Sequence, residues 1–572
     1  MVLGLASAAS ASEASGLARE WLALGHWQPA VFGGYKSTID DDAFFFHPRG
    51  KTDPEAEMAA SIAAMERASP DMGDDHPACL FPARFAYLKK LRPSLRAPKA
   101  CPALEATLRD LSAVRATLVF TDAYMNNPAS QYGHTLLRLD GAAGLLSHAV
   151  NYAADTGGEA GLLFALRGLL GSYRGRVSLR RYPDIIKQYA AMENRDLWEY
   201  PLNLIPAQLD LLQRHLWEMG RAWADYYFFT ENCSYMLMEI LDAANPDWRL
   251  ARQFPLAAIP ADTVRAALRA GAASAIGVGW RPSRRAELAW LAEAAPASPR
   301  FAYALAQYRF ESGTTDLPAY RAESFAALQA MRAAPPAALE PPRPAYRPDQ
   351  AHASASASVS GGARAGQAFA EVMAKPAYHD LMDDSRGMSR AVRTDFFALT
   401  ARAYDGGGAR LHEFSLAEVK SLAPRGELFD PISWQAGLRV ADWRRLDSGE
   451  NGHVGQVEIG AGGAWNIGAA GALAYVLAKG HAAAGAVVDK GWTVGAGAEA
   501  GVFADFGPAR LAASAEPVWF TDSGLTRTLA SVSASWSVGA NFTVEAKASR
   551  WLAHTRDSDD FGEWSLGAKL FF

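Results

Sequence analysis

The sequence predicts a multidomain protein in which an α+β region is followed by a C-terminal antiparallel β-barrel. Three observations predict this fold class. The chain has 572 residues, more than one hydrophobic core accommodates. Residues 111–250 mix short apolar strands with amphipathic helices. From about residue 350, charged residues thin out, glycine and alanine increase, and alternation of side chains replaces helical spacing.

The first 110 residues divide into a short tail and a helical segment. Residues 1–14 are small and apolar and contain Ala-Ser-Ala, as at a signal cleavage site, but they lack a basic start. We interpret them as a signal-peptide remnant or a flexible tail. Residues 15–110 are predicted to form a helical domain. It carries Cys79 and Cys101, which either pair in an oxidising compartment or stay reduced as packing residues; the sequence leaves both open.

Residues 111–250 carry the third cysteine, Cys233. The cap-forming residues Thr230, Asn232 and Ser234 lead into an apolar run with helical spacing, which predicts a buried helix with a thiol in its first turn. A helix N-terminus lowers the pKa of a thiol and favours the nucleophilic thiolate. By itself, a single cysteine is more often a small packing residue.

Two predicted strands upstream of Cys233 carry its candidate partners. Residues 133–139 form a strand with His134, and residues 145–152 form the next strand with His148 and Asn151. A thiol at a helix start and an imidazole on a strand are the components of a cysteine–histidine nucleophile. His148 and Asn151 are an odd number of residues apart, so a regular strand points them to opposite faces and only one of them can join the pair.

The remaining chain is a helical segment and then the barrel. Residues 251–349 are alanine-rich and helical and end in a proline-rich linker. In residues 350–572, apolar Trp564, Leu566 and Leu570 share one face of the last strand while Lys569 lies on the other. At ~9–11 residues per crossing, this length allows about 12 strands of an outer-membrane β-barrel. A soluble β-sandwich would show the same alternation.

Composition excludes some classes of function. The net charge of -5 and a pI near 6.2 give no electrostatic case for nucleic acid as a partner. No window of about 18 uncharged apolar residues predicts a transmembrane helix. We expect no cofactor. A zinc site built from His134, His148 and Cys233 is an alternative, but no Cys-x-x-Cys or His-x-x-x-His spacing supports it.

Three segments together resemble one protein family: residues 127–138 (NPASQYGHTLLR), 149–154 (AVNYAA) and 232–235 (NCSY). The family is DUF4105, also named for the periplasmic domain of the lipoprotein N-acylating transferase Lnb. The order of histidine strand, strand and cysteine helix is also similar to circularly permuted NlpC/P60 papain-like enzymes, including lecithin:retinol acyltransferases. The resemblance covers about residues 120–245 and implies a permuted papain-like fold for the catalytic domain, residues 111–250.

The resemblance implies roles for individual residues. Cys233 matches the nucleophile and His134 matches the base. Asn151 fits the family's Asn-Tyr/Phe-Ala-Ala pattern, whereas His148 fits the second histidine of the retinol-acyltransferase type; we favour Asn151. Three supporting residues each have a simpler explanation as well: Ser130 and Asn126 either help to orient His134 or only form a turn, and Asn232 either contributes to an oxyanion hole with the Cys233 amide or only caps the helix.

The expected function is that of a periplasmic thiol acyltransferase or hydrolase, anchored in the outer membrane by the barrel. The resemblance implies a phospholipid or lipoprotein as substrate and a thioester as intermediate. Two alternatives remain open. One is a peptidoglycan peptide hydrolase of the NlpC/P60 type, and the other is a non-enzymatic outer-membrane channel or scaffold.

Overall fold

The computed structural model describes residues 17–30, 32–125, 131–141, 147–159, 162–333, 340–468, 471–554 and 559–572. The predicted tail, residues 1–14, lies outside these ranges. The chain divides into two compact units, Met1–Arg343 and Pro344–Phe572. The segments 15–110 and 111–250, predicted as separate domains, thus belong to the same unit, together with most of the segment 251–349.

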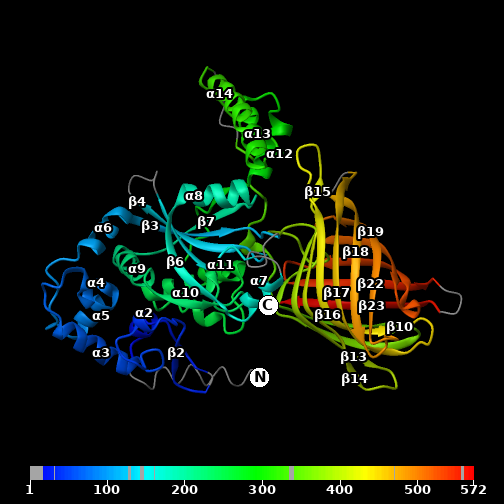
Figure 1. Cartoon of the computed structure of the whole chain (residues 1–572), viewed down its shortest axis with the longest axis horizontal. Helices are drawn as coiled ribbons and strands as arrows, with labels where there is room; N and C mark the ends of the chain where they lie inside the picture. Colours follow the sequence, from blue (N-terminus) through cyan, green and yellow to red (C-terminus); the bar gives the residue numbers. More distant parts are fainter. Residues whose placement is uncertain are drawn as a thin grey trace. The chain divides into compact units, whose positions relative to one another are not determined.

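The first unit is built on a sheet with the strand order β8-β6-β5-β4-β3-β7-β9, in which every pairing is antiparallel (Figure 1). Its apolar residues alternate between two cores. In β4, Leu137 and Leu139 face one core, while Leu136 faces the other. The strands are β3 (Ala113–Thr121), β4 (His134–Gly141), β5 (His148–Ala154), β6 (Tyr173–Arg181), β7 (Leu197–Pro201), β8 (Trp223–Tyr226) and β9 (Gly279–Arg281).

Helices lie against this sheet. The helix α10 (Cys233–Ala244) packs on β4 and β5. The second core, which includes Leu136, is filled by α8 (Tyr182–Ile186) and the π-helix η4 (Lys187–Met192). Every helix in the described part of the chain is too short or too polar to cross a bilayer. From residue 102 onward the chain also forms the helices α6 (Pro102–Leu111), α7 (Leu162–Leu169), α9 (Pro206–Met219), α11 (Pro260–Arg269), α12 (Arg284–Ala294), α13 (Pro299–Glu311) and α14 (Leu317–Ala333).

The N-terminal segment packs directly on the cysteine helix. Trp21 and Met65 share a core with Ala243 of α10. The carboxylate of Glu218 on α9 accepts the backbone N–H groups of Ala83 and Arg84 at 2.6 and 3.1 Å. The segment contains β1 (Trp27–Pro29), β2 (Tyr35–Ser37), α2 (Arg19–Leu24), α3 (Pro54–Arg67), α4 (Pro77–Leu80) and α5 (Pro82–Leu91).

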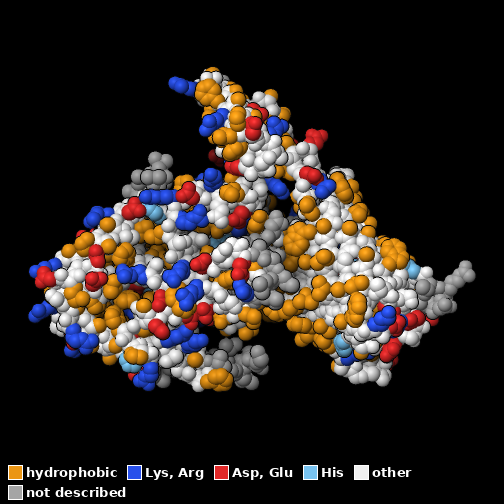
Figure 2. Space-filling model, in the orientation of Figure 1, with side chains coloured by type: hydrophobic (Ala, Val, Ile, Leu, Met, Phe, Trp, Pro, Cys, Tyr) orange, Lys and Arg blue, Asp and Glu red, His pale blue; other side chains and the backbone are white. Residues whose placement is uncertain are grey.

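The second unit is an antiparallel barrel of 12 strands, as predicted, and pairing of β11 with β13 closes it, so the β-sandwich alternative is wrong. Trp564 and Leu566 of the last strand point outward, each 57% exposed, while Lys569 lies inside. Figure 2 shows hydrophobic side chains over the outer surface of the barrel. Its strands are β10 (Ser356–Arg364), β11 (Gln367–Lys375), β13 (Val392–Tyr404), β14 (Ala409–Ser421), β16 (Ser433–Arg444), β17 (Asn451–Ile467), β18 (Ala472–Gly485), β19 (Trp492–Asp505), β20 (Ala509–Phe520), β21 (Arg527–Ser537), β22 (Phe542–Ala553) and β23 (Phe561–Phe571), with short β12 (Ala377–His379) and β15 (Pro424–Arg425) beside them.

Candidate functional site

Cys233 is the first residue of α10 and is the free cysteine of the chain, because Cys79 and Cys101 form a disulfide. The helix begins here because Asn232 caps it: its Oδ1 accepts the N–H groups of Ser234 and Tyr235 at 3.0 and 3.2 Å. Both Asn232 Nδ2 hydrogens go to carbonyl oxygens, those of Phe228 and Ala258. The side chain therefore caps the helix and has no N–H left for an oxyanion, contrary to the role considered for it.

His134, the first residue of β4, lies beside the thiol of Cys233 and interacts with it electrostatically. The His134 ring also contacts Asn151 on the neighbouring strand β5. The Oδ1 atom of Asn151 lies 2.7 Å from His134 Nε2. An amide oxygen only accepts, so Nε2 carries the proton and Nδ1 is left for the sulfur. All three side chains are buried. The arrangement joins a nucleophile, a base and a residue that orients the base.

The electrostatics favour an ion pair between the sulfur and the imidazole. Burial by itself raises the pKa of the Cys233 thiol, but the His134 imidazolium, the Thr135 backbone N–H and the Ser234 hydroxyl outweigh it and lower the pKa to about 6. Burial correspondingly lowers the pKa of His134, yet the thiolate and Asn151 raise it above its ordinary value. These shifts favour the pair of thiolate and imidazolium over the neutral pair.

Tyr226, at the end of β8, is a site residue that the sequence reasoning missed. Its hydroxyl accepts the backbone N–H of Cys233 at 3.2 Å. Burial and the neighbouring thiolate raise the pKa of Tyr226 well above its ordinary value, so the hydroxyl keeps its proton. A hydrogen-bond donor thus stands beside the sulfur. The sequence offered one sign of it, the aromatic run 226–229 immediately before the cysteine motif.

The other candidates lie elsewhere. His148 points to the opposite face of β5 from Asn151 and pairs with Asp110 of α6 at 3.0 Å. His148 therefore lies on the opposite face of the sheet from His134 and Cys233, so these three residues do not form the zinc site considered as an alternative. Asn126 and Ser130 lie outside the described residues. The alternation along one strand thus brings Asn151, and not His148, to His134.

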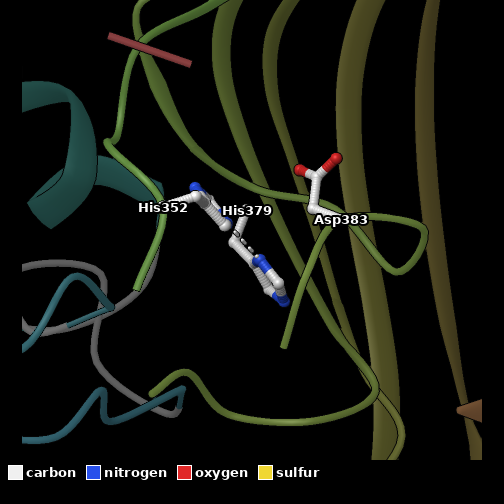
Figure 3. A group of neighbouring side chains, drawn as sticks. All are labelled: His352, His379 and Asp383. Carbon is white, nitrogen blue, oxygen red and sulfur yellow. Dashed lines mark hydrogen bonds between the residues drawn. The ribbon is translucent and has the colours of Figure 1, made fainter. Parts of the chain in front are cut away.

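Two groups among the described residues resemble metal sites, and both belong to the barrel. In the first, Asp383 lies near His352 and His379 (Figure 3), but its carboxylate already pairs with Lys569 at 2.7 Å and with Lys375. The second group, Glu458, His481 and Glu516, surrounds Lys479, which lies 2.6 Å from Glu458 and 2.9 Å from Glu516. A lysine ammonium at the carboxylates repels a second cation, so neither group fits a metal.

The ion pair predicts an unusual titration. Raising the pH through about 6 should ionise Cys233, whereas an ordinary thiol ionises near ~8.5. The thiolate is measured by its ultraviolet absorbance, as the difference between the native chain and Cys233→Ser. Because Cys79 and Cys101 are paired, the difference reports Cys233 alone. In His134→Ala, the midpoint should move up towards that of an ordinary thiol; an unmoved midpoint would contradict the ion pair.

Parts of both units match known protein families. Residues 103–270 match the family model of the Lnb N-terminal periplasmic domain. Residues 345–571 match a domain of unknown function, DUF7840, and residues 17–91 match another, DUF7843. No curated protein matches the chain. The family match covers the strands and the helix that carry Cys233, His134 and Asn151.

Several solved outer-membrane proteins are similar to the barrel. LpxR from Salmonella typhimurium matches at 13% identity over 38% of this chain and 100% of that chain, with a TM-score of 0.24. OmpT of Vibrio cholerae matches at 11% identity over 38% and 96%, with a TM-score of 0.19. Omp33 of Acinetobacter baumannii matches at 8% identity over 39% and 100%, with a TM-score of 0.23. These similarities are too distant to bear on activity.

The features of the two units indicate where the protein is located in the cell. The first contains a match to a periplasmic domain, and the second is a closed barrel with an apolar outer face. The barrel lies in the outer membrane, and the domain that contains Cys233 lies in the periplasm. The disulfide between Cys79 and Cys101 fits this oxidising compartment.

Proposed function

We propose that this protein is a periplasmic thiol acyltransferase or hydrolase that acts on lipid or lipoprotein acyl groups. One observation carries the proposal: a free thiol at a helix N-terminus contacts an imidazole whose far nitrogen is bound by Asn151. This is the arrangement of an activated cysteine nucleophile. The order of histidine strand and cysteine helix along the chain further supports a circularly permuted papain-like fold.

The proposed reaction has two stages. The Cys233 thiolate attacks the carbonyl carbon of an acyl ester, and the carbonyl oxygen becomes an oxyanion that accepts a hydrogen bond from the Tyr226 hydroxyl, whose own oxygen accepts the Cys233 N–H. The ester C–O bond then breaks, and the leaving alcohol takes the proton of His134. In the second stage, an amine or water gives a proton to His134 and attacks the thioester. Its C–S bond breaks and the thiolate returns.

Two observations favour a lipid acyl donor. The catalytic domain belongs to the same chain as an outer-membrane barrel, and phospholipid esters are concentrated in that membrane. The matched family is named for Lnb, and the resemblance to a lipoprotein N-acylating enzyme points to the same class of donor. The alternative, hydrolysis of peptidoglycan peptides, uses the same nucleophile, so the substrate assay decides between them.

The test uses the full chain in detergent or proteoliposomes. We expect lysophospholipid or free fatty acid to be released from phosphatidylethanolamine vesicles, and no new fragments to be released from muropeptides. Cys233→Ala serves as the control for both. Release of peptide fragments without lipid turnover would overturn the lipid proposal and favour the peptidase. Turnover of neither substrate would overturn both.

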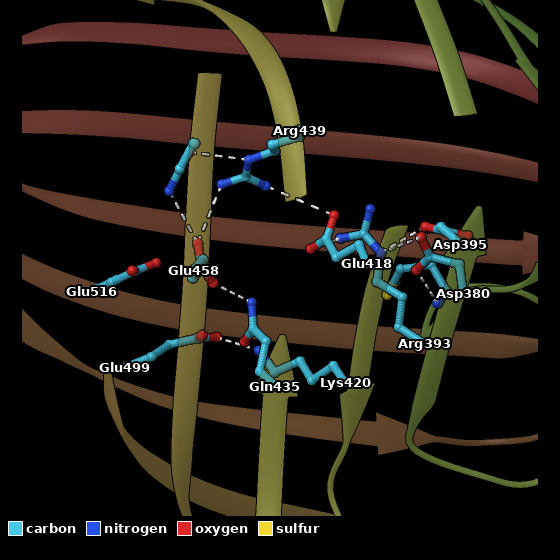
Figure 4. Close-up of polar contacts among 12 residues, drawn as sticks. Asp380, Arg393, Asp395, Glu418, Lys420, Gln435, Arg439, Glu458, Glu499 and Glu516 are labelled. Atoms are coloured by element: carbon cyan, nitrogen blue, oxygen red, sulfur yellow. Dashed lines mark hydrogen bonds and ion pairs between the residues drawn. The ribbon is translucent and has the colours of Figure 1, made fainter. Parts of the chain in front are cut away.

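The barrel interior bears on the channel alternative. Its charged side chains pair across neighbouring strands on the inner wall (Figure 4). Lys420 pairs with Glu499 at 2.6 Å, and Arg393 pairs with Asp395 and Glu418 at 2.7 and 2.9 Å. Lys479 pairs with Glu499 as well, and with Glu458 and Glu516. Charges paired in this way neutralise one another along the inner wall.

We infer that the segment 380–391 closes one end of this lumen. Asp383 pairs with Lys569 on β23, and Asp384 pairs with Arg510 on β20 at 3.1 Å. In the strand order, β20 lies across the ring from β13, where the segment ends. The carbonyl of Met382 also accepts the Ser535 hydroxyl of β21 at 2.7 Å. The segment therefore spans the barrel and is held at several points.

This closure predicts that the barrel does not conduct. In planar lipid bilayers, the full chain should give no steady ion current. The double change Asp383→Ala and Asp384→Ala removes the ion pairs that tie the segment to Lys375, Lys569 and Arg510, so the segment should detach and current should appear. Exposed Glu450→Ala, in a loop, is the control and should change nothing. Stable channels from the unaltered chain would revive the channel alternative.

A further inference from the structure

A second aromatic ring lies against the His134 imidazole. The ring of Tyr189 stacks on it, with centroids 5.6 Å apart and an interplanar angle of 29°. Tyr189 is 6% exposed and belongs to the core that includes Leu136, two residues after His134. The contact is thus part of the packed interior.

Arg195 stands behind Tyr189. Its guanidinium carbon lies 4.9 Å from the centroid of the Tyr189 ring, a cation–π distance. The guanidinium is held at 2.6 Å from the carbonyl oxygen of Asp122, at 3.3 Å from that of Thr121 and at 2.9 Å from Glu193. Thr121 is the residue paired with His134 across strands β3 and β4. Arg195 therefore contacts both the Tyr189 ring and the end of strand β3 that pairs with His134.

The backbone around Tyr189 is also unusual. Residues Lys187–Met192 form a π-helix that continues α8. Such a turn is rare and less favourable than an α-helix, and it is frequent at functional sites. Here the wider turn carries Tyr189, the residue that contacts the imidazole.

We propose that Tyr189, supported by Arg195, is a positioning residue that holds the plane of the His134 ring in line with the Cys233 sulfur; this rests on the proposed function. The Asn151 contact fixes one ring nitrogen, but a single in-plane hydrogen bond leaves the ring free to tilt about it. A stacked ring opposes that tilt. Together the two contacts fix both the direction and the plane of the base, which a proton transfer to or from sulfur requires.

The test measures the Cys233 thiolate by ultraviolet absorbance against pH in the full chain. Tyr189→Leu removes the stacked ring, so the midpoint should rise by about one pH unit or more from its native value near 6, towards ~8.5. Turnover of the lipid substrate should fall about tenfold in kcat, with KM little changed. Tyr189→Phe keeps the ring and should restore both values.

Tyr182→Leu is the matched control. Tyr182 is a buried tyrosine of the same core, but its ring lies under Arg138, away from His134. It should lower the melting temperature about as much as Tyr189→Leu and leave the midpoint in place. Equal shifts of the midpoint in both variants, or no rescue by Tyr189→Phe, would overturn the positioning role.

His134→Ala separates this inference from the proposed function. If His134→Ala raises the midpoint and Tyr189→Leu does not, the ion pair stands and the role of Tyr189 fails. If His134→Ala does not raise it, the ion pair itself fails, and the proposed function fails with it.

Discussion

Replacing Cys233 by alanine should abolish lipid turnover and leave the fold in place. The thiolate forms the covalent bond in the proposed reaction, so its loss should lower kcat/KM on the order of 10⁴-fold or more, as for other nucleophiles. The side chain is small, so the cavity should cost only about 1–2 kcal/mol of unfolding free energy. Lysophospholipid release and the melting temperature measure the two effects.

Cys233→Ser is the matched control for this variant. It keeps the size of the side chain and the hydrogen-bonding groups around it, but its hydroxyl does not ionise near neutral pH. We expect it to be as inactive as Cys233→Ala. Substantial turnover by either variant, in a chain that melts like the native protein, would show that the sulfur is not the nucleophile.

Asn151→Ala should give the second largest loss, about 10²-fold in kcat. Without the Asn151 oxygen, nothing holds the proton of His134 on Nε2, and the imidazole is free to turn away from the sulfur. His148→Ala is the control on the same strand: its side chain pairs with Asp110 at the other face and should leave kcat unchanged. Kinetics with the lipid substrate compare the two.

The opposite ranking would contradict this account. A larger loss in His148→Ala than in Asn151→Ala would mean that the second histidine serves the reaction, as in enzymes of the retinol-acyltransferase type. Equal losses accompanied by equal drops in melting temperature would mean that both changes act on folding alone.

The sequence predicts the helix start at Cys233 and the strand of His134 because both signals are local: a capping residue, a β-rich run and an alternation of faces. It also restricts the third residue to Asn151 or His148. The choice between them needs the fold, since it depends on which face of β5 meets His134. Tyr189 carries no local signal and Tyr226 only that of an aromatic run, because strand pairing and the packing of η4 bring these residues to the site.

In the barrel, too, some features are predictable from the sequence and others are not. Its strands are predictable because each outward residue alternates with an inward one. The segment 380–391 is not predictable, since Asp383 and Asp384 look like a solvated turn in the sequence and find their lysine and arginine partners only across the closed ring. The pairing of Cys79 with Cys101 likewise depends on a distance that spacing along the chain does not give.

Mass spectrometry of the Cys233 peptide tests the central claim most directly. The full chain is exposed to phospholipid vesicles, quenched in acid and digested. We predict a fatty-acyl mass on Cys233 that hydroxylamine removes, as it removes a thioester, and that is absent in His134→Ala. Lipid turnover with Cys233 unmodified at every time point, including when the acceptor is withheld, would contradict the account.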